Sequence, residues 1–148
     1  MIEIFAVKEV GDLEGVFSLI EEEALELDID FSKVSKDKCL AAFMHCVNSG
    51  VVLLAKRDAS VVGILALLSQ EVWWSEEVAT VCNLMFYVSK SARNSTISFR
   101  LLNKAKELVK VAGLELNIFV DSNEDLDRKH EFFKRLSFNH RGGTYRFN

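Results

Sequence analysis

The sequence predicts an α/β domain in which α-helices are layered on a mixed β-sheet. Two patterns carry this prediction. Apolar residues recur at steps of three and four in several segments, and short runs rich in Val, Ile and Leu alternate with those segments. The chain of 148 residues has the size of one ordinary domain, and its sequence holds no Pro, internal repeat or low-complexity linker. We therefore expect residues 1–148 to form one domain.

The first half of the chain predicts a strand, two helices and two further strands. Asp12 is expected to cap the first helix and Ser35 the second, because a side-chain oxygen at that position accepts an amide of the first turn. Gly50 lies just past the second helix, where glycine commonly ends a helix. The five elements are expected near residues 2–4, 13–27, 36–49, 51–55 and 61–68.

The second half predicts a long strand, a helix, a strand, a short helix and a last strand. The first of these helices carries an apolar stripe and stops at Gly113. Two strands that flank one well-formed helix can make a βαβ crossover, in which they run parallel. The antiparallel strands before it make the sheet mixed. The five elements are expected at residues 78–88, 97–112, 114–120, 126–136 and 144–148, which gives six strands and four helices in all.

Charge is distributed unevenly along the chain. Residues 1–88 hold six basic and fifteen acidic side chains, a net charge of −9, whereas residues 89–110 hold six basic side chains and one acid, a net charge of +5. An acidic chain with one basic segment is a poor candidate for nucleic-acid binding. It is a better candidate for a protein that holds one small anionic ligand at that segment.

Cysteine spacing and hydropathy predict a cytoplasmic protein. Three cysteines without a Cys-x-x-Cys spacing fit neither a disulfide framework nor a zinc site, so we expect reduced thiols and no metal. The central apolar run at 61–68 is too short to cross a membrane, which takes about 20 residues in a helix. The N-terminus carries acids within its apolar stretch and does not resemble a signal peptide.

The turn between the long strand and the following helix consists of small or polar residues and two cations, Lys90 and Arg93. Amides at a helix N-terminus have no partner within the helix and carry the positive end of its dipole. A strand that leads through small residues into such a helix therefore offers a site for a phosphate. Lys104 or Arg100 could reach back and add charge. The alternative is an ordinary Ser/Thr cap on a solvated helix.

The order of elements and this turn resemble the Gcn5-related N-acetyltransferase (GNAT) superfamily over nearly the whole chain. In that family the turn reads Arg or Gln, two residues, Gly, one residue, then Gly or Ala, and its amides hold the pyrophosphate of acetyl-coenzyme A. In this sequence "RNSTIS" stands there, with Arg93 first and with Thr96 and Ser98 at the two small positions, so neither Gly is present. The resemblance implies a mixed sheet of about six to seven strands with about four helices.

A second match lies downstream. The family pattern Tyr-x-x-Leu-Gly-Phe resembles "FKRLSF", in which Phe133 stands in place of the Tyr that donates a proton to coenzyme A in many members. Asn123 lies about one turn before the position of a cofactor-contacting Asn. The resemblance thus implies an acetyl-coenzyme A site with a polarising main-chain amide within residues 86–88. Its expected residues are Phe86, Tyr87, Val88, Arg93, Asn94, Ser95, Thr96, Ile97, Ser98, Asn123 and Phe133.

A general base is not evident in the sequence. Members often place a Glu on the long strand where this chain has Asn83. Glu71 is one candidate, since burial by Trp73 and Trp74 would raise its pKa, and His130 is another. Each has a plainer reading as a solvated side chain. The two Trp residues are adjacent, so on a strand they would face opposite sides of the sheet.

Six acids between Glu21 and Asp30 fall where the family forms its acceptor side, and they would attract a cationic amine or a basic peptide. The alternative is a solvated helix face. A homodimer is compatible with the sequence. The leading hypothesis is an N-acetyltransferase that moves acetyl from acetyl-coenzyme A to an amine by direct transfer in a ternary complex. The alternative hypothesis is a catalytically inactive protein of GNAT fold that acts as a binding or structural module.

Overall fold

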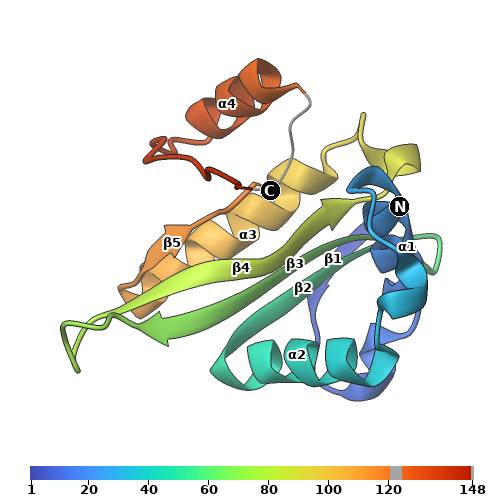
Figure 1. The fold of residues 1–148 in the computed structure, drawn as a ribbon, viewed down its shortest axis with the longest axis horizontal. Helices are drawn as coiled ribbons and strands as arrows, with labels where there is room; N and C mark the ends of the chain where they lie inside the picture. Colours follow the sequence, from blue (N-terminus) through green and yellow to red (C-terminus); the bar gives the residue numbers. More distant parts are fainter. Residues whose placement is uncertain (121–124, 148) are drawn as a thin grey trace.

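The computed structural model describes residues 1–120 and 125–147, and it arranges them as a sheet with helices on both faces (Figure 1). The sheet has the order β1-β2-β3-β4-β5, with β1 to β4 antiparallel and β5 parallel to β4. Its strands are β1 (Ile2–Ala6), β2 (Gly50–Arg57), β3 (Ser60–Glu71), β4 (Ala79–Val88) and β5 (Glu115–Asn117). The predicted mixed sheet and its parallel crossover are confirmed.

Two helices cover one face of the sheet and a third covers the other. On the first face lie α1 (Val16–Glu26) and α2 (Lys36–Ser49), and on the second lies α3 (Ile97–Ala112) (Figure 1). The helix α4 (Leu126–Arg135) packs its Phe132 and Phe133 against the core on the α3 side. Three short 3-10 helices complete the set: η1 (Val10–Leu13), η2 (Phe31–Lys33) and η3 (Lys90–Ala92).

Each face of the sheet has its own apolar core. The α3 side buries Ile97, Leu101 and Ala105 completely, as the predicted stripe requires, and Gly113 ends the helix with a φ of 70°. The other side buries Leu19 of α1 and Cys46 of α2, among others. Because β2 and β3 contribute side chains to both cores, these strands are held from both faces and form a rigid base for the neighbouring β4.

Two cap predictions have different outcomes. Ser35 caps α2 as expected, because its hydroxyl accepts the Lys38 amide at 3.2 Å. The expected cap by Asp12 is wrong: its carboxylate accepts the amides of Lys8 (3.0 Å) and Glu9 (3.2 Å) and closes the turn of η1 instead. Asp12 is the third residue of a capping box around η1, whose N-cap is Glu9, and helix α1 starts only at Val16.

The C-terminal half contains fewer strands than expected. The predicted strand 114–120 shortens to Glu115–Asn117, and residues 144–147 form no strand. Tyr145 and Phe147 are fully exposed, so no apolar burial offsets the cost of ordering a strand there. Within the described residues the sheet therefore has five strands, below the six to seven expected, with four α-helices as expected.

The two tryptophans lie at the tip of the β3–β4 hairpin and not on a strand. Both are largely exposed, Trp73 at 95% and Trp74 at 63%, so the premise that they face opposite sides of a sheet is wrong. The tip is closed by the Val72 amide, which donates to the Val78 carbonyl at 3.1 Å. Separately, no helix among the described residues has both the length and the apolar character that crossing a bilayer requires.

Candidate active site

The strand β4 changes direction in its middle. Its register with β3 shifts so that Met85 pairs with Ala66 while Asn83 pairs with Leu67, which leaves Leu84 as an extra residue. Such a bulge bends a strand and reverses which side chains face each side of the sheet. Val81 lies in the α3-side core before the bulge, and Phe86 and Val88 join that core after it. After the bulge, even-numbered side chains of β4 face α3, whereas before it odd-numbered ones do.

The parallel strand β5 accompanies only the first half of β4. Backbone pairing covers Thr80 to Cys82 and stops there. The next contact is made by the side chain of Asn83, whose Nδ2 donates to the Phe119 carbonyl (3.0 Å) and whose Oδ1 accepts the Phe119 amide (2.7 Å). A side chain fills the space between the two backbones, so the strands have diverged. Asn83, which occupies the family's Glu position, is here a bridge across that divergence.

Beyond the divergence, no strand among the described residues pairs with the outer side of β4. The Ser89 amide donates to the Val62 carbonyl at 2.8 Å, so it points toward β3. Because successive amides of a strand point in opposite directions, those of Val88 and Phe86 point away from β3, toward the open side. The Val88 carbonyl has the same orientation, since it accepts Arg93 Nε at 3.0 Å. Phe86 and Val88 therefore direct main-chain amides to the side where the family resemblance implies a donor.

The turn that follows β4 reaches the first turn of α3 without left-handed backbone. Among the described residues, those with positive φ all lie outside the segment 89–98. Arg93 has a φ of −68° and Thr96 a φ of −84°. The absence of both family glycines therefore costs no backbone strain here, because the conformation suits any L-residue.

Two amides at the start of α3 point outward from the helix end. The first intrahelical bond runs from the Arg100 amide to the Thr96 carbonyl at 2.9 Å, so the amides of Ser98 and Phe99 precede the helical ladder. Ser95 serves the amide before them: its hydroxyl accepts the Ile97 amide at 3.3 Å and also donates to the Ala92 carbonyl. Thr96 makes no side-chain cap. This end of α3 combines outward amides with the positive end of the helix dipole.

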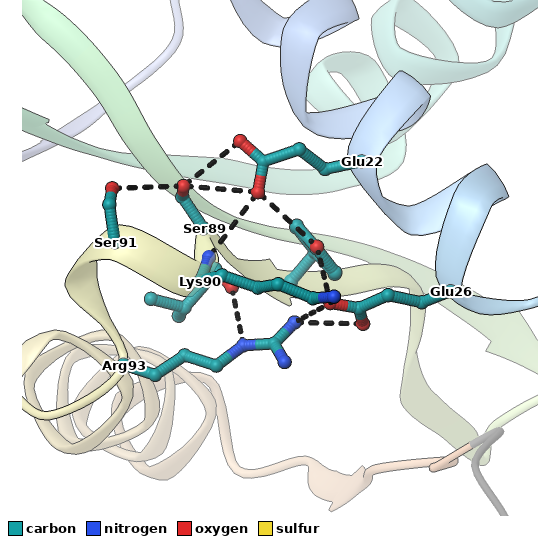
Figure 2. A network of polar contacts seen from close by, with 8 residues as sticks. Glu22, Glu26, Ser89, Lys90, Ser91 and Arg93 are labelled. Atoms are coloured by element: carbon teal, nitrogen blue, oxygen red, sulfur yellow. Dashed lines mark hydrogen bonds and ion pairs between the residues drawn. The ribbon is translucent and has the colours of Figure 1, made fainter.

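Two carboxylates of α1 reach across to the same turn (Figure 2). Glu22 accepts the Ser89 hydroxyl at 3.0 Å and the Lys90 amide at 3.3 Å. Glu26 accepts Arg93 Nη2 on both oxygens, at 2.7 and 2.8 Å, and lies 3.6 Å from Lys90 Nζ. These contacts tie the end of α1 to the junction between β4 and α3.

Tyr87 completes this network from the strand. Its hydroxyl donates to Glu26 at 3.0 Å, and the Arg93 guanidinium lies 5.1 Å from its ring centre. Burial and the hydrogen bond to Glu26 raise the pKa of Tyr87, so the phenol stays protonated. Partial burial acts to raise the pKa of Glu26, but hydrogen bonds from Arg93 and Tyr87 outweigh it and lower that pKa. Glu26 is therefore an ionised carboxylate that is satisfied on both oxygens.

The structure brings part of the predicted site together. Phe86 to Val88, Arg93 and the segment 94–98 converge at one corner. Glu71 does not join them, because it pairs with Ala79 at the other end of β4. Ala79 is nine residues before Val88, which corresponds to about 30 Å along the strand. His130 is exposed on α4, with its ring 4.5 Å from that of His140.

Other predicted residues take separate places. Phe133 is half-buried and packs edge-to-face against Phe132 and Phe138, with ring centres 5.6 and 5.5 Å away. Asn123 lies outside the described residues. Arg100 does not reach back to the turn, because its Nη1 donates to the Ile2 carbonyl at 3.0 Å. Lys104 lies 3.7 Å from Glu107 instead.

Sequence reasoning missed the individual roles of Glu22 and Glu26. It treated the acids of 21–30 as one attractive or solvated group, whereas two of them, four residues apart, turn toward the protein. That spacing puts both on one face of α1, the only signal in the sequence that could have singled them out. Among residues 1–120 and 125–147, no three His, Cys, Asp or Glu side chains are grouped as a metal site would need.

Comparison with solved structures shows the same fold. An aminoglycoside acetyltransferase from an uncultured soil metagenomic sample, crystallised with trehalose, has a TM-score of 0.74 at 16% identity, over 99% of this chain and 95% of its own. A transcriptional regulator from Bacillus halodurans has a TM-score of 0.73 at 20% identity, over 99% and 100%. A ribosomal-protein-alanine N-acetyltransferase from Brucella melitensis has a TM-score of 0.70 at 12% identity, over 100% and 99%.

Sequence comparison identifies the family. No curated protein sequence matches this chain. The model of the acetyltransferase (GNAT) family matches residues 18–138, which include most of α1, the bulged strand β4, the turn and α3. The chain therefore belongs to the GNAT family of acetyltransferases.

Proposed function

We propose that the protein transfers an acetyl group from acetyl-coenzyme A to an amine by direct attack within a ternary complex. One observation carries this proposal: the open backbone edge of β4 and the outward amides of α3 meet at the same corner. The edge of β4 offers an amide to a thioester carbonyl, and the amides of α3 can bind a diphosphate. Acetyl-coenzyme A contains both groups. Acetyl-coenzyme A supplies an activated acyl group that an amine can attack.

The residues at this corner have distinct proposed roles. The amides of Ser98 and Phe99, with the dipole of α3, bind the diphosphate. Arg93 adds a cation that can bind phosphate oxygens through two N–H groups. One amide of this edge, that of Phe86 or of Val88, donates to the acyl oxygen and stabilises the negative charge that develops on it. Tyr87, Asn94, Ser95, Thr96 and Ile97 complete the proposed cofactor contacts at this corner, and Asn123 and Phe133 stay predictions for the cofactor site.

Transfer requires a neutral amine near the end of β4. The amine nitrogen forms a bond to the acyl carbon, the carbon–sulfur bond breaks, and coenzyme A leaves as a thiolate that takes up a proton. The amine loses a proton in turn, and a positioned base would accelerate that step by about 10²–10⁴-fold. Glu71 and His130 stay predictions for this base, and the position of Glu71 weighs against it. Direct loss of the proton to water is the simpler route here.

The proposed acceptor is a cationic small molecule or a basic peptide. Support comes from the acids of α1 and the following loop that do not contact the turn, among them Glu21, Asp28 and Asp30, and from the negative charge of residues 1–88. We also propose a cytoplasmic setting, because Cys39, Cys46 and Cys82 are all free thiols.

The direct test is binding and turnover with acetyl-coenzyme A. Acetyl-coenzyme A at 100 times its dissociation constant should stabilise the protein by about 2.7 kcal/mol in thermal unfolding. Addition of a panel of primary amines and basic peptides should then release coenzyme A thiol. The variant Arg93→Gln should weaken binding about tenfold, whereas Arg100→Gln, which removes the same charge nearby, should leave it unchanged.

The outcomes separate the hypotheses. An unchanged melting temperature at millimolar acetyl-coenzyme A would reject the proposed site. A clear shift with no thiol release across the amine panel would favour the catalytically silent binding module.

A further inference from the structure

We propose that the diphosphate of acetyl-coenzyme A must break the ion pair between Glu26 and Arg93 in order to bind the Arg93 guanidinium. We call this ion pair the latch. This inference rests on the proposed function and concerns how the same site is regulated. Arg93 is the one cation of the turn that the family resemblance places on the diphosphate, yet its guanidinium is already bound. Figure 2 shows Arg93 and Glu26 turned toward one another across the junction of β4 and α3.

The contacts of Arg93 occupy two of its three guanidinium nitrogens in this state, although its side chain is 43% exposed. Nη2 donates to both oxygens of Glu26, and Nε donates to the Val88 carbonyl. Charge-assisted bonds of this kind are about twice as strong as neutral ones. A diphosphate that binds Arg93 must therefore replace contacts of similar chemistry. Its binding free energy is then the free energy of the new contacts minus that of the contacts with Glu26 and Val88.

The latch also reaches the strand end where the acyl group is proposed to lie. Arg93 Nε binds the carbonyl of Val88, whose amide belongs to the proposed acyl-oxygen site. When Arg93 moves to a diphosphate, the Val88 carbonyl and the Glu26 carboxylate lose their partner together. Lys90, at 3.6 Å from Glu26 and with its side chain 69% exposed, is placed to take over the carboxylate. Binding of the cofactor thus changes the charge pattern on the side of α1.

The remaining charged groups support a competition at Arg93 in particular. Glu22 accepts the Ser89 hydroxyl and the Lys90 amide and attracts Arg93 only through its charge, whereas Glu26 binds the guanidinium directly. Tyr87 donates to Glu26 and stays protonated, which keeps the carboxylate oriented toward Arg93. Glu26 is therefore a positioning residue that acts through Arg93.

The experiment is a double-mutant cycle in which titration calorimetry measures the affinity for acetyl-coenzyme A at fixed pH and salt. The four proteins are the wild type, Glu26→Gln, Arg93→Gln and the double variant. Glu26→Gln should bind acetyl-coenzyme A about tenfold more tightly, because Arg93 is free. In the Arg93→Gln background the same change should have no effect, because no latch remains. Glu14→Gln removes an equal charge from an exposed position just before α1 and should leave affinity unchanged.

General repulsion between Glu26 and phosphate would tighten binding equally in both backgrounds, and that result would overturn the latch. Equal affinity of the wild type and Glu26→Gln would also overturn it. If Glu26→Gln does not fold, Glu26→Asp provides the test, since the shorter acid keeps the charge but loses the bidentate contact. If none of the proteins binds millimolar acetyl-coenzyme A, the proposed function fails and the latch with it. Binding to Glu26→Gln alone would support both.

Discussion

At the scale of single residues, the candidate site depends on side chains that satisfy backbone groups. Asn83 bridges to the backbone of Phe119, Ser95 serves the amide of Ile97, and Arg93 binds the carbonyl of Val88. Each side chain replaces a hydrogen bond that regular structure would otherwise provide. The strand and helix ends around the site are therefore kept open, while no buried side-chain nitrogen or oxygen of the described residues lacks a hydrogen-bond partner.

The Glu26–Arg93 pair should make stability depend on pH. The pKa of Glu26 is lowered in the folded protein, so its contribution is present above its ordinary pKa of 4.5 and is lost as pH falls through the folded value. We expect Glu26→Gln to lower the free energy of unfolding by about 1–3 kcal/mol at pH 7. The deficit should shrink below pH 4.5. Urea unfolding at pH 7 and pH 3 measures this, and a deficit that is constant with pH would contradict it.

Asn83 should contribute both stability and the separation of the strands. Asn83→Ala removes a donor and an acceptor from the Phe119 backbone, and we expect a loss of about 1–2 kcal/mol in unfolding free energy. Asn83→Asp keeps the acceptor for the Phe119 amide but loses the donor, so its loss should be intermediate at neutral pH. Hydrogen exchange at the Phe119 amide gives a local readout. Full protection of that amide in Asn83→Ala would show that the bridge is unimportant.

At the scale of elements, regular patterns were readable from the sequence and irregular ones were not. The stripe of α3, the Ser35 cap and the crossover from β4 to β5 follow from local periodicity and turn chemistry. The bulge at Leu84 and the divergence after Cys82 depend on how β4 pairs with two neighbours, which no local pattern encodes. The role of Asp12 differs from the expected helix cap because an acidic residue can also close a capping box from its third position, as Asp12 does for η1.

The junction between α2 and β2 offers a sharp test of packing between elements. A Cβ on Gly50 would lie 2.2 Å from the Leu67 carbonyl oxygen, a backbone atom that cannot move aside. We expect Gly50→Ala to destabilise the protein by more than about 2 kcal/mol. Gly143→Ala, where no atom lies within 4 Å of the added Cβ, is the matched control and should change stability by less than about 0.5 kcal/mol. Equal melting temperatures for the two variants would contradict this packing.

At the scale of the whole molecule, charge and fold act together. The basic segment 89–110 contributes Arg93 and Lys90 to the corner, but Arg100, Lys104 and Lys106 are turned to other partners. Net charge along the sequence predicts an anion site at this segment, but a count along the chain does not show which of its cations pair with other residues in the fold. The acids of α1 supply the counter-charge, a relation between distant segments that only the fold reveals.

The central claim is that the amides opening α3 bind the diphosphate of acetyl-coenzyme A. A crystal structure of the protein with coenzyme A tests it most directly. We expect the diphosphate within hydrogen-bonding distance of the Ser98 and Phe99 amides, with Arg93 turned from Glu26 toward the phosphates. A diphosphate bound elsewhere on the molecule, with this corner unchanged, would contradict the account.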